Sequence, residues 1–221
     1  MMNKRKITKQ YTFTVEGNTE KWYFDWLNEC LKAETDLKCN VKVISKVYPN
    51  PLSYAKRINT TSTAYLAHIC DVEGNQESEI NRFKGVLDQL NQANRFYPNN
   101  FNYNLGYSNF TFELWMILHK QDCNSHLSHR TKYLNKINQA FNEKFQNLTE
   151  YKKEVNFKRC LSKLSLEDVK DAIERAKKIM ELNKENGVKK EKCSGFEFYL
   201  HNPSLTIYEA VETIFKDCGL L

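Results

Sequence analysis

Residues 64–74 read AYLAHICDVEG, a nearly continuous apolar run that ends in two acidic residues and a glycine. A run of this kind predicts a strand that is buried on both faces and lies near the centre of a parallel sheet. Residues 11–17, YTFTVEG, follow the same plan, with β-branched and aromatic residues before Glu16. Two such strands, each ending in acid, indicate a sheet whose carboxyl ends carry the chemistry.

Strands and helices alternate outward from these two segments. The spacing of apolar residues predicts a helix from Thr19 to about Lys32, capped by Thr19 or Asn18. Further expected elements of the first half are a strand at 41–47, a helix from Pro51 to about Asn59, a helix at 77–93, a strand at 102–107 and a helix at 112–119. The alternation predicts an α/β fold with a mainly parallel sheet flanked by helices.

The second half of the sequence is mostly helical. We expect helices at 127–145 and 166–182, an exposed polar segment at 183–192, and a last helix that starts at Asn202-Pro203-Ser204. The length of 221 residues suits one domain. We therefore expect a single domain over 1–221, with an α/β core at 1–123 and a helical extension at 124–221 that closes on the core.

Composition narrows the class of protein. The formal net charge is +6, which is compatible with a polyanionic partner. No run approaches 18 apolar residues, and no signal-peptide pattern opens the chain, so we expect a cytoplasmic protein without membrane contact. The seven cysteines form no CxxC pair, which favours reduced thiols.

Three acidic side chains are expected to meet at the carboxyl edge of the sheet. Glu16 ends the first strand, and Asp71 and Glu73 end the third. Crowded carboxylates repel one another unless a cation neutralises them, and hard oxygen ligands suit Mg²⁺ or Mn²⁺. Such a metal could activate water for phosphodiester hydrolysis. The alternative interpretation is structural, because acids after strands often cap helices or lie in solvent.

Four segments together resemble the RloB-like family. They are TFTVEGNTEKWYF (12–24), ICDVEGNQ (69–76), SNFTFELWMILHK (108–120) and NPSLTIYEAVE (202–212). Their order and spacing agree with the family, and the Phe-Glu-Leu-Trp segment is the most specific of them. The family usually has Asp-x-Asp at the second segment, whereas this chain has Glu73, which is one methylene longer.

The resemblance implies a Toprim-like catalytic fold and a site. On that pattern Glu16 is a metal ligand or general acid/base, Asp71 and Glu73 are metal ligands, and Glu113 is a candidate fourth carboxylate. Glu113 could equally be an acid stabilised by a helix N-terminus. The resemblance also implies an AAA/ABC-type ATPase partner of the SMC-like kind, encoded alongside in abortive-infection and restriction-linked loci such as AbiL-type two-gene systems.

Two further clusters have competing interpretations. His119, Cys123, His126 and His129 are residue types that suit zinc, but no second ligand pair lies at finger spacing, so incidental histidines in a solvated loop are preferred. A basic stretch with interleaved aromatics could bind a nucleic-acid backbone, although neighbouring acids could balance it on a solvated face. Its members are Lys152, Lys153, Lys158, Arg159 and Lys163.

The leading hypothesis is a Mg²⁺- or Mn²⁺-dependent endonuclease acting on DNA or RNA, with tRNA among the candidate targets, as the effector of an antiphage defence system. The alternative is a non-catalytic regulatory or nucleic-acid-binding subunit of the ATPase complex, in which the carboxylates are structural. A homodimer, the number of metal ions and the trigger are left open by the sequence.

Overall fold

The computed structural model describes residues 6–58, 65–96 and 102–221. A five-stranded sheet with the order β2-β1-β3-β4-β7 forms its centre. The first four strands of this order run parallel, and β7 pairs antiparallel with the end of β4. The strands are β1 (Thr8–Val15), β2 (Asn40–Val47), β3 (Tyr65–Asp71), β4 (Tyr103–Asn109) and β7 (Ser204–Leu205).

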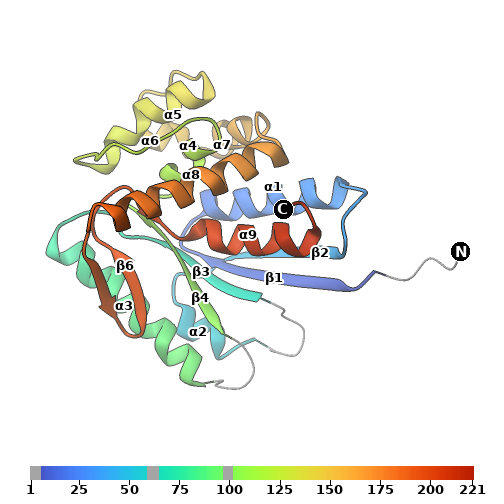
Figure 1. The fold of residues 1–221 in the computed structure, drawn as a ribbon, viewed down its shortest axis with the longest axis horizontal. Helices are drawn as coiled ribbons and strands as arrows, with labels where there is room; N and C mark the ends of the chain where they lie inside the picture. The colour runs from blue at the N-terminus through green and yellow to red at the C-terminus, as the bar shows by residue number, and fades with distance from the viewer. Residues whose placement is uncertain (1–5, 59–64, 97–101) are drawn as a thin grey trace, which may run out of the picture.

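Helices cover both faces of the sheet (Figure 1). On one face lie α1 (Asn18–Ala33) and α9 (Ile207–Cys218), and on the other lie α2 (Pro51–Ala55) and α3 (Glu77–Phe96). Neighbouring residues of one strand point to opposite faces. Ile69 of β3 accordingly belongs to the core that packs on α1 and α9, and Cys70 belongs to the core under α3. The predicted α/β class with a mainly parallel, helix-flanked sheet is confirmed.

A group of helices packs against the N-terminal half of α1. Its members are α4 (Glu113–Leu118), α5 (Tyr133–Phe141), α6 (Leu148–Tyr151), α7 (Glu154–Leu161) and α8 (Leu166–Glu185). Aromatic contacts join this group to α1, since Trp22 lies against Phe157 at 5.9 Å between ring centroids and Tyr23 lies against Trp115 at 6.1 Å. The group therefore shares one hydrophobic core with α1 and α9, and the helical second half is confirmed.

The C-terminal segment differs from the sequence-based expectation. Residues expected to be exposed and polar lead into a hairpin of β5 (Lys190–Cys193) and β6 (Phe196–Tyr199). The last helix begins at Ile207, not at Asn202. The Asn202 side chain bonds both the N–H and the C=O of Leu127, at 2.8 and 3.0 Å. These bonds and the pairing of β7 with β4 hold the Asn-Pro-Ser segment out of the helix.

The helix expected at 127–145 is shorter, because only Tyr133–Phe141 is α-helical. Asn142 adopts a left-handed backbone with φ 50°, which ends the helix. The side chain of Asn138 then bonds both backbone groups of Phe145 at 2.9 Å. At the first helix the cap is Gly17, without a side-chain bond, and not Asn18 or Thr19. The second helix ends at Ala55.

None of the helices in the described part of the chain combines the length and apolar character needed to span a membrane.

Candidate functional site

The carboxyl ends of β1 and β3 place two of the expected acids side by side. The strands are adjacent and parallel, with Val15 opposite Ile69, so the residues that follow emerge at the same edge. There the backbone N–H of Asp71 donates a hydrogen bond to Oε2 of Glu16 over 3.2 Å. Both residues line a pocket of about 350 Å³ with the start of α1. This is the position at which open α/β sheets bind ligands.

Glu20, on the first turn of α1, is a third acid in this pocket that the sequence reasoning missed. Its side chain is buried, and Thr19 Oγ1 donates to its carboxylate over 3.2 Å. Gly17 makes room for it, because a Cβ at that position would lie 3.0 Å from Oε2 of Glu20. The spacing Glu16-Gly17-x-x-Glu20, across a strand end and a first helical turn, is the signal that could have revealed Glu20.

Glu113 and Lys152 form an ion pair beside the acids. Glu113 opens α4 and is fully buried, and its Oε1 lies 3.1 Å from Nζ of Lys152, which follows α6. Thr111 donates a further hydrogen bond to the Glu113 carboxylate. Lys152 also lines the acidic pocket. Lys152 was expected to contact nucleic acid as part of a basic stretch. The structure places it among the carboxylates of the acidic pocket.

The acidic pocket holds more negatively charged groups than positively charged ones. Burial and then the charges of Glu20, Glu16 and Glu113 raise the pKa of Asp71 well above its ordinary value. Burial also raises the pKa of Glu16 and of Glu20, and nearby carboxylates add to both. For Lys152, whose side chain is partly exposed, desolvation disfavours the charged form, but the charges of Glu113 and Asp71 outweigh this effect and raise its pKa. The ammonium of Lys152, with a smaller contribution from the guanidinium of Arg82, thus faces four carboxylates, and the pocket favours additional positive charge.

Glu73 lies at the border of the pocket and takes other partners. Its backbone has a left-handed φ of 68°, and its N–H donates to the carbonyl of Phe110 over 2.8 Å. Its carboxylate forms an ion pair with Arg82 and lies 3.9 Å from a guanidinium nitrogen of Arg130. The structure therefore brings Glu16, Asp71 and Glu113 together with Glu20, while the Glu73 carboxylate is held by arginines at the rim.

The rest of the basic stretch is largely engaged with acids. Arg159 and Lys163 both pair with Glu143, at 2.8 and 2.6 Å, and the hydrogen bond from Arg159 contributes most to lowering the pKa of Glu143 to about 2. Lys158 pairs with Glu154 at 2.5 Å. Lys153 is exposed at the start of α7. This arrangement matches the balanced, solvated face that the sequence left open.

The histidine and cysteine cluster is not assembled for zinc. His119 is fully buried, and its two ring nitrogens lie 3.1 Å from Tyr23 Oη and 2.9 Å from the carbonyl of Trp115. Burial lowers its pKa to about 4. Cys123 is also buried, while His126 and His129 bond the backbone at Asn202 and Thr131. The expectation of a solvated loop is thus wrong for His119 and Cys123, which pack in the core.

The acidic pocket fits a hard divalent cation in its chemistry. Carboxylate oxygens are the ligands that Mg²⁺ and Mn²⁺ prefer, and burial, with the charges of neighbouring carboxylates, raises the pKa of Glu16, Glu20 and Asp71. Across 6–58, 65–96 and 102–221, no three His, Cys, Asp or Glu side chains stand in a ligand cage. Glu16, Glu20 and Asp71 would therefore need side-chain rotation to share one ion.

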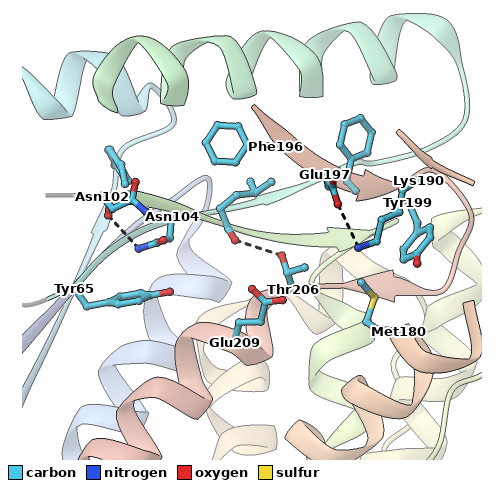
Figure 2. A pocket seen from close by; sticks show the side chains of 13 residues that line it. Tyr65, Asn102, Asn104, Met180, Lys190, Phe196, Glu197, Tyr199, Thr206 and Glu209 are labelled. Carbon is cyan, nitrogen blue, oxygen red and sulfur yellow. Dashed lines mark hydrogen bonds and ion pairs between the residues drawn. The ribbon is translucent and has the colours of Figure 1, made fainter. Parts of the chain in front are cut away.

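A second cavity of about 330 Å³ lies at the opposite end of the sheet, between the start of β4, the β5–β6 hairpin and α9 (Figure 2). Its charged groups are Glu209, which points in from α9, and the pair Lys190 and Glu197, whose charged atoms lie 3.5 Å apart. Ligands of open parallel sheets collect at the carboxyl ends of the strands. We therefore centre the functional site on Glu16 and Asp71.

Acids gathered at the carboxyl edge of a mainly parallel, helix-covered sheet define an α/β protein with a strand-end acidic site. The chain belongs to the RloB-like family, because the family model described as RloB-like protein matches residues 11–214. The match runs from β1 into α9 and so includes the acidic pocket and its helical neighbours. Searches of curated proteins and of solved structures gave no match.

Proposed function

We propose that this protein is a Mg²⁺- or Mn²⁺-dependent endonuclease that hydrolyses phosphodiester bonds in DNA or RNA. The observation that carries the proposal is the contact of Asp71 with Glu16 at adjacent strand ends. The carboxylates of Glu20 and Glu113 stand close enough to raise the pKa of Asp71. Burying that much like charge is costly, and a divalent ion offsets the cost.

The chain's own residues divide the work in this proposal. Glu16, Glu20 and Asp71 hold the metal, with Glu73 as a further ligand if it leaves its arginine partners. When bound, the metal supplies an activated water and stabilises charge on the phosphate. Lys152 is fixed by Glu113, 3.1 Å away, and presents its ammonium to the pocket. That ammonium binds a phosphate oxygen of the substrate and keeps the scissile group at the acidic edge.

The biological setting of the proposal follows the family. We propose an effector of a bacterial antiphage defence system, working in the cytoplasm with an ABC/SMC-like ATPase encoded alongside. The ATPase would restrain or trigger cleavage, and tRNA is one candidate target.

A cleavage assay tests the activity. The purified chain, with and without the partner ATPase, is incubated with end-labelled single-stranded and duplex DNA, RNA and tRNA in Mg²⁺, Mn²⁺ or EDTA. We expect metal-dependent products that Glu16→Gln and Asp71→Asn abolish. Glu209→Gln removes a carboxylate in the distant cavity of Figure 2 and serves as the matched control, with cleavage retained. Cleavage that persists in EDTA or in Asp71→Asn contradicts the proposal.

A second function is favoured by a specific observation. The Lys152–Glu113 ion pair and the Arg82–Glu73 ion pair neutralise two of the acids with the chain's own cations. Such pairing suits a non-catalytic regulatory or nucleic-acid-binding subunit of the ATPase complex. In that case Asp71→Asn leaves defence against phage intact, whereas the nuclease proposal requires defence to be lost.

A further inference from the structure

Trp22 belongs to two neighbouring pockets. It lines the acidic pocket together with Glu16 and Asp71, and it also lines a separate cleft of about 380 Å³. The second cleft lies between α1 and α7, where Trp26 and Leu161 form the other apolar walls. Its volume falls within the range of small-molecule sites, roughly 300–1,000 Å³. The indole of Trp22 is therefore a shared wall between the acids and an apolar cleft.

The two indoles of this cleft are supported from behind and partly exposed in front. Trp22 packs on Phe157 at 5.9 Å between ring centroids, and Trp26 packs on Tyr23 at 5.6 Å. Both side chains keep intermediate exposure, whereas the third tryptophan, Trp115, is fully buried. Supported but accessible aromatic faces lose little conformational entropy when a flat ligand stacks on them.

The two acids that line this cleft, Asp25 and Glu29, are both paired with lysines, so they repel a polyanion only weakly. Asp25 pairs with Lys21 one turn before it, and Glu29 pairs with Lys32 at 2.8 Å. Lys158, which lines the cleft from α7, pairs with Glu154 at 2.5 Å. The rim is therefore close to neutral, and on the other side of Trp22 the ammonium of Lys152 attracts phosphate.

We propose that the cleft between α1 and α7 binds an unpaired nucleobase, so that the substrate is single-stranded nucleic acid or an unpaired loop. The inference rests on the proposed function, since it places the sugar-phosphate backbone at the acidic pocket and one base against Trp22 and Trp26. Aromatic side chains stack on any base, because every base has a π-face. In a duplex the base faces are already stacked on their neighbours and cannot enter the cleft.

Binding in EDTA tests this inference independently of cleavage. Intrinsic tryptophan fluorescence is titrated with oligothymidylate, with oligouridylate and with a blunt duplex of matched length. Quenching reports on Trp22 and Trp26, because Trp115 is buried. We expect quenching by the single strands and much less by the duplex. Comparison of the thymidylate and uridylate affinities shows whether the natural source of the base is DNA or RNA.

Variants of Trp26 decide the assignment, because Trp26 lines the cleft without lining the acidic pocket. Trp26→Leu keeps an apolar wall but loses the aromatic face, and we expect about tenfold weaker single-strand binding. Trp26→Phe restores most of the affinity and guards against a folding artefact. Val155→Ala removes an exposed apolar side chain of α7 outside the cleft and should bind like the parent.

The outcomes separate this inference from the nuclease proposal. Trp26-dependent binding supports the cleft even if no cleavage is found. Metal-dependent cleavage with equal single-strand affinity for the parent and Trp26→Leu overturns the cleft and leaves the nuclease proposal standing. Duplex binding as tight as single-strand binding also overturns the cleft. A third result would also overturn the cleft as a base-binding site: Trp26→Leu no longer co-purifies with the ATPase but binds nucleic acid with unchanged affinity. The cleft would then be a contact surface for the ATPase.

Discussion

The backbone N–H of Asp71, at the end of β3, donates a hydrogen bond to the carboxylate of Glu16, which follows β1, over 3.2 Å. The bond ties together two strand ends that lie 55 residues apart in sequence. It fixes the Glu16 carboxylate beside the Asp71 side chain, although the two charges repel.

Metal binding is expected to raise the thermal stability of the protein. A ligand that binds only the folded state stabilises it by about 2.7 kcal/mol at a concentration one hundred times its Kd. Because a change of 1 kcal/mol shifts Tm by about 2–4 °C at this size, Mn²⁺ should raise Tm by roughly 5–11 °C in a thermal-shift assay. Asp71→Asn should remove the shift and Glu209→Gln should keep it. A shift that is equal in all three proteins would place the metal elsewhere.

Without metal, the free energy of unfolding should fall as the pH rises and Asp71 becomes ionised. Burial and like charges raise the folded-state pKa of Asp71, so the unfolded chain loses that proton first. The contribution to stability is present below about pH 4 and is lost as pH rises through the folded-state value. Asp71→Asn, which stays neutral, should therefore be more stable than the parent at pH 7.5 in EDTA. Urea unfolding at pH 4 and pH 7.5 measures this difference, which should shrink at the lower pH.

Gly17→Ala tests the close approach at the acidic edge. The added Cβ would lie 3.0 Å from Oε2 of Glu20, so the carboxylate has to move. Gly17 has an extended backbone with φ −140°, which alanine adopts without strain. We expect weaker Mn²⁺ binding, by roughly tenfold if a ligand is displaced, with a Tm in EDTA close to that of the parent. Unchanged Mn²⁺ affinity in calorimetry would remove Glu20 from the set of ligands.

Lys152→Met should destabilise the fold through Glu113. That carboxylate is fully buried and would lose its ion-pair partner, which costs about 1–3 kcal/mol. Adding Glu113→Gln should recover most of this loss, because a neutral amide needs no counter-charge. Chemical unfolding of the two single variants and the double variant measures the coupling. If the double variant is no more stable than Lys152→Met alone, the pair is not a coupled unit.

The double variant also distinguishes the two candidate functions. In the nuclease proposal Lys152 binds substrate phosphate, so a stable Lys152→Met/Glu113→Gln protein should cleave nucleic acid poorly. A regulatory subunit that uses this pair only for folding should protect cells normally with the same change. Phage plating efficiency measures that outcome.

The acids at the strand ends could be found from the sequence because their signals are local. An apolar run followed by Glu16-Gly17 or by Asp71-x-Glu73 marks both the strand and its end. The alternation of strands and helices predicts parallel strands, whereas the direct pairing of β1 with β3 is seen only in the structure. The prediction of a helix start at Asn202-Pro203-Ser204 was wrong. Proline and serine are typical of the first turn of a helix, but the local sequence does not reveal the hydrogen bonds of Asn202 to the distant Leu127.

The sequence by itself determined the parallel sheet, its helical cover and the acidic ends of β1 and β3, since periodicity and strand-end chemistry are written in neighbouring residues. Only the tertiary structure decided which charges meet there. In the folded protein the Lys152–Glu113 ion pair lies at the carboxyl edge of the sheet, and the Glu20 carboxylate lies close to Gly17. The Glu73 carboxylate forms an ion pair with Arg82. The physical reason is that electrostatic partners are chosen by distance and burial in space. The paired residues come from segments that are far apart in the chain, and the local sequence pattern of each segment does not specify which other segment it will contact.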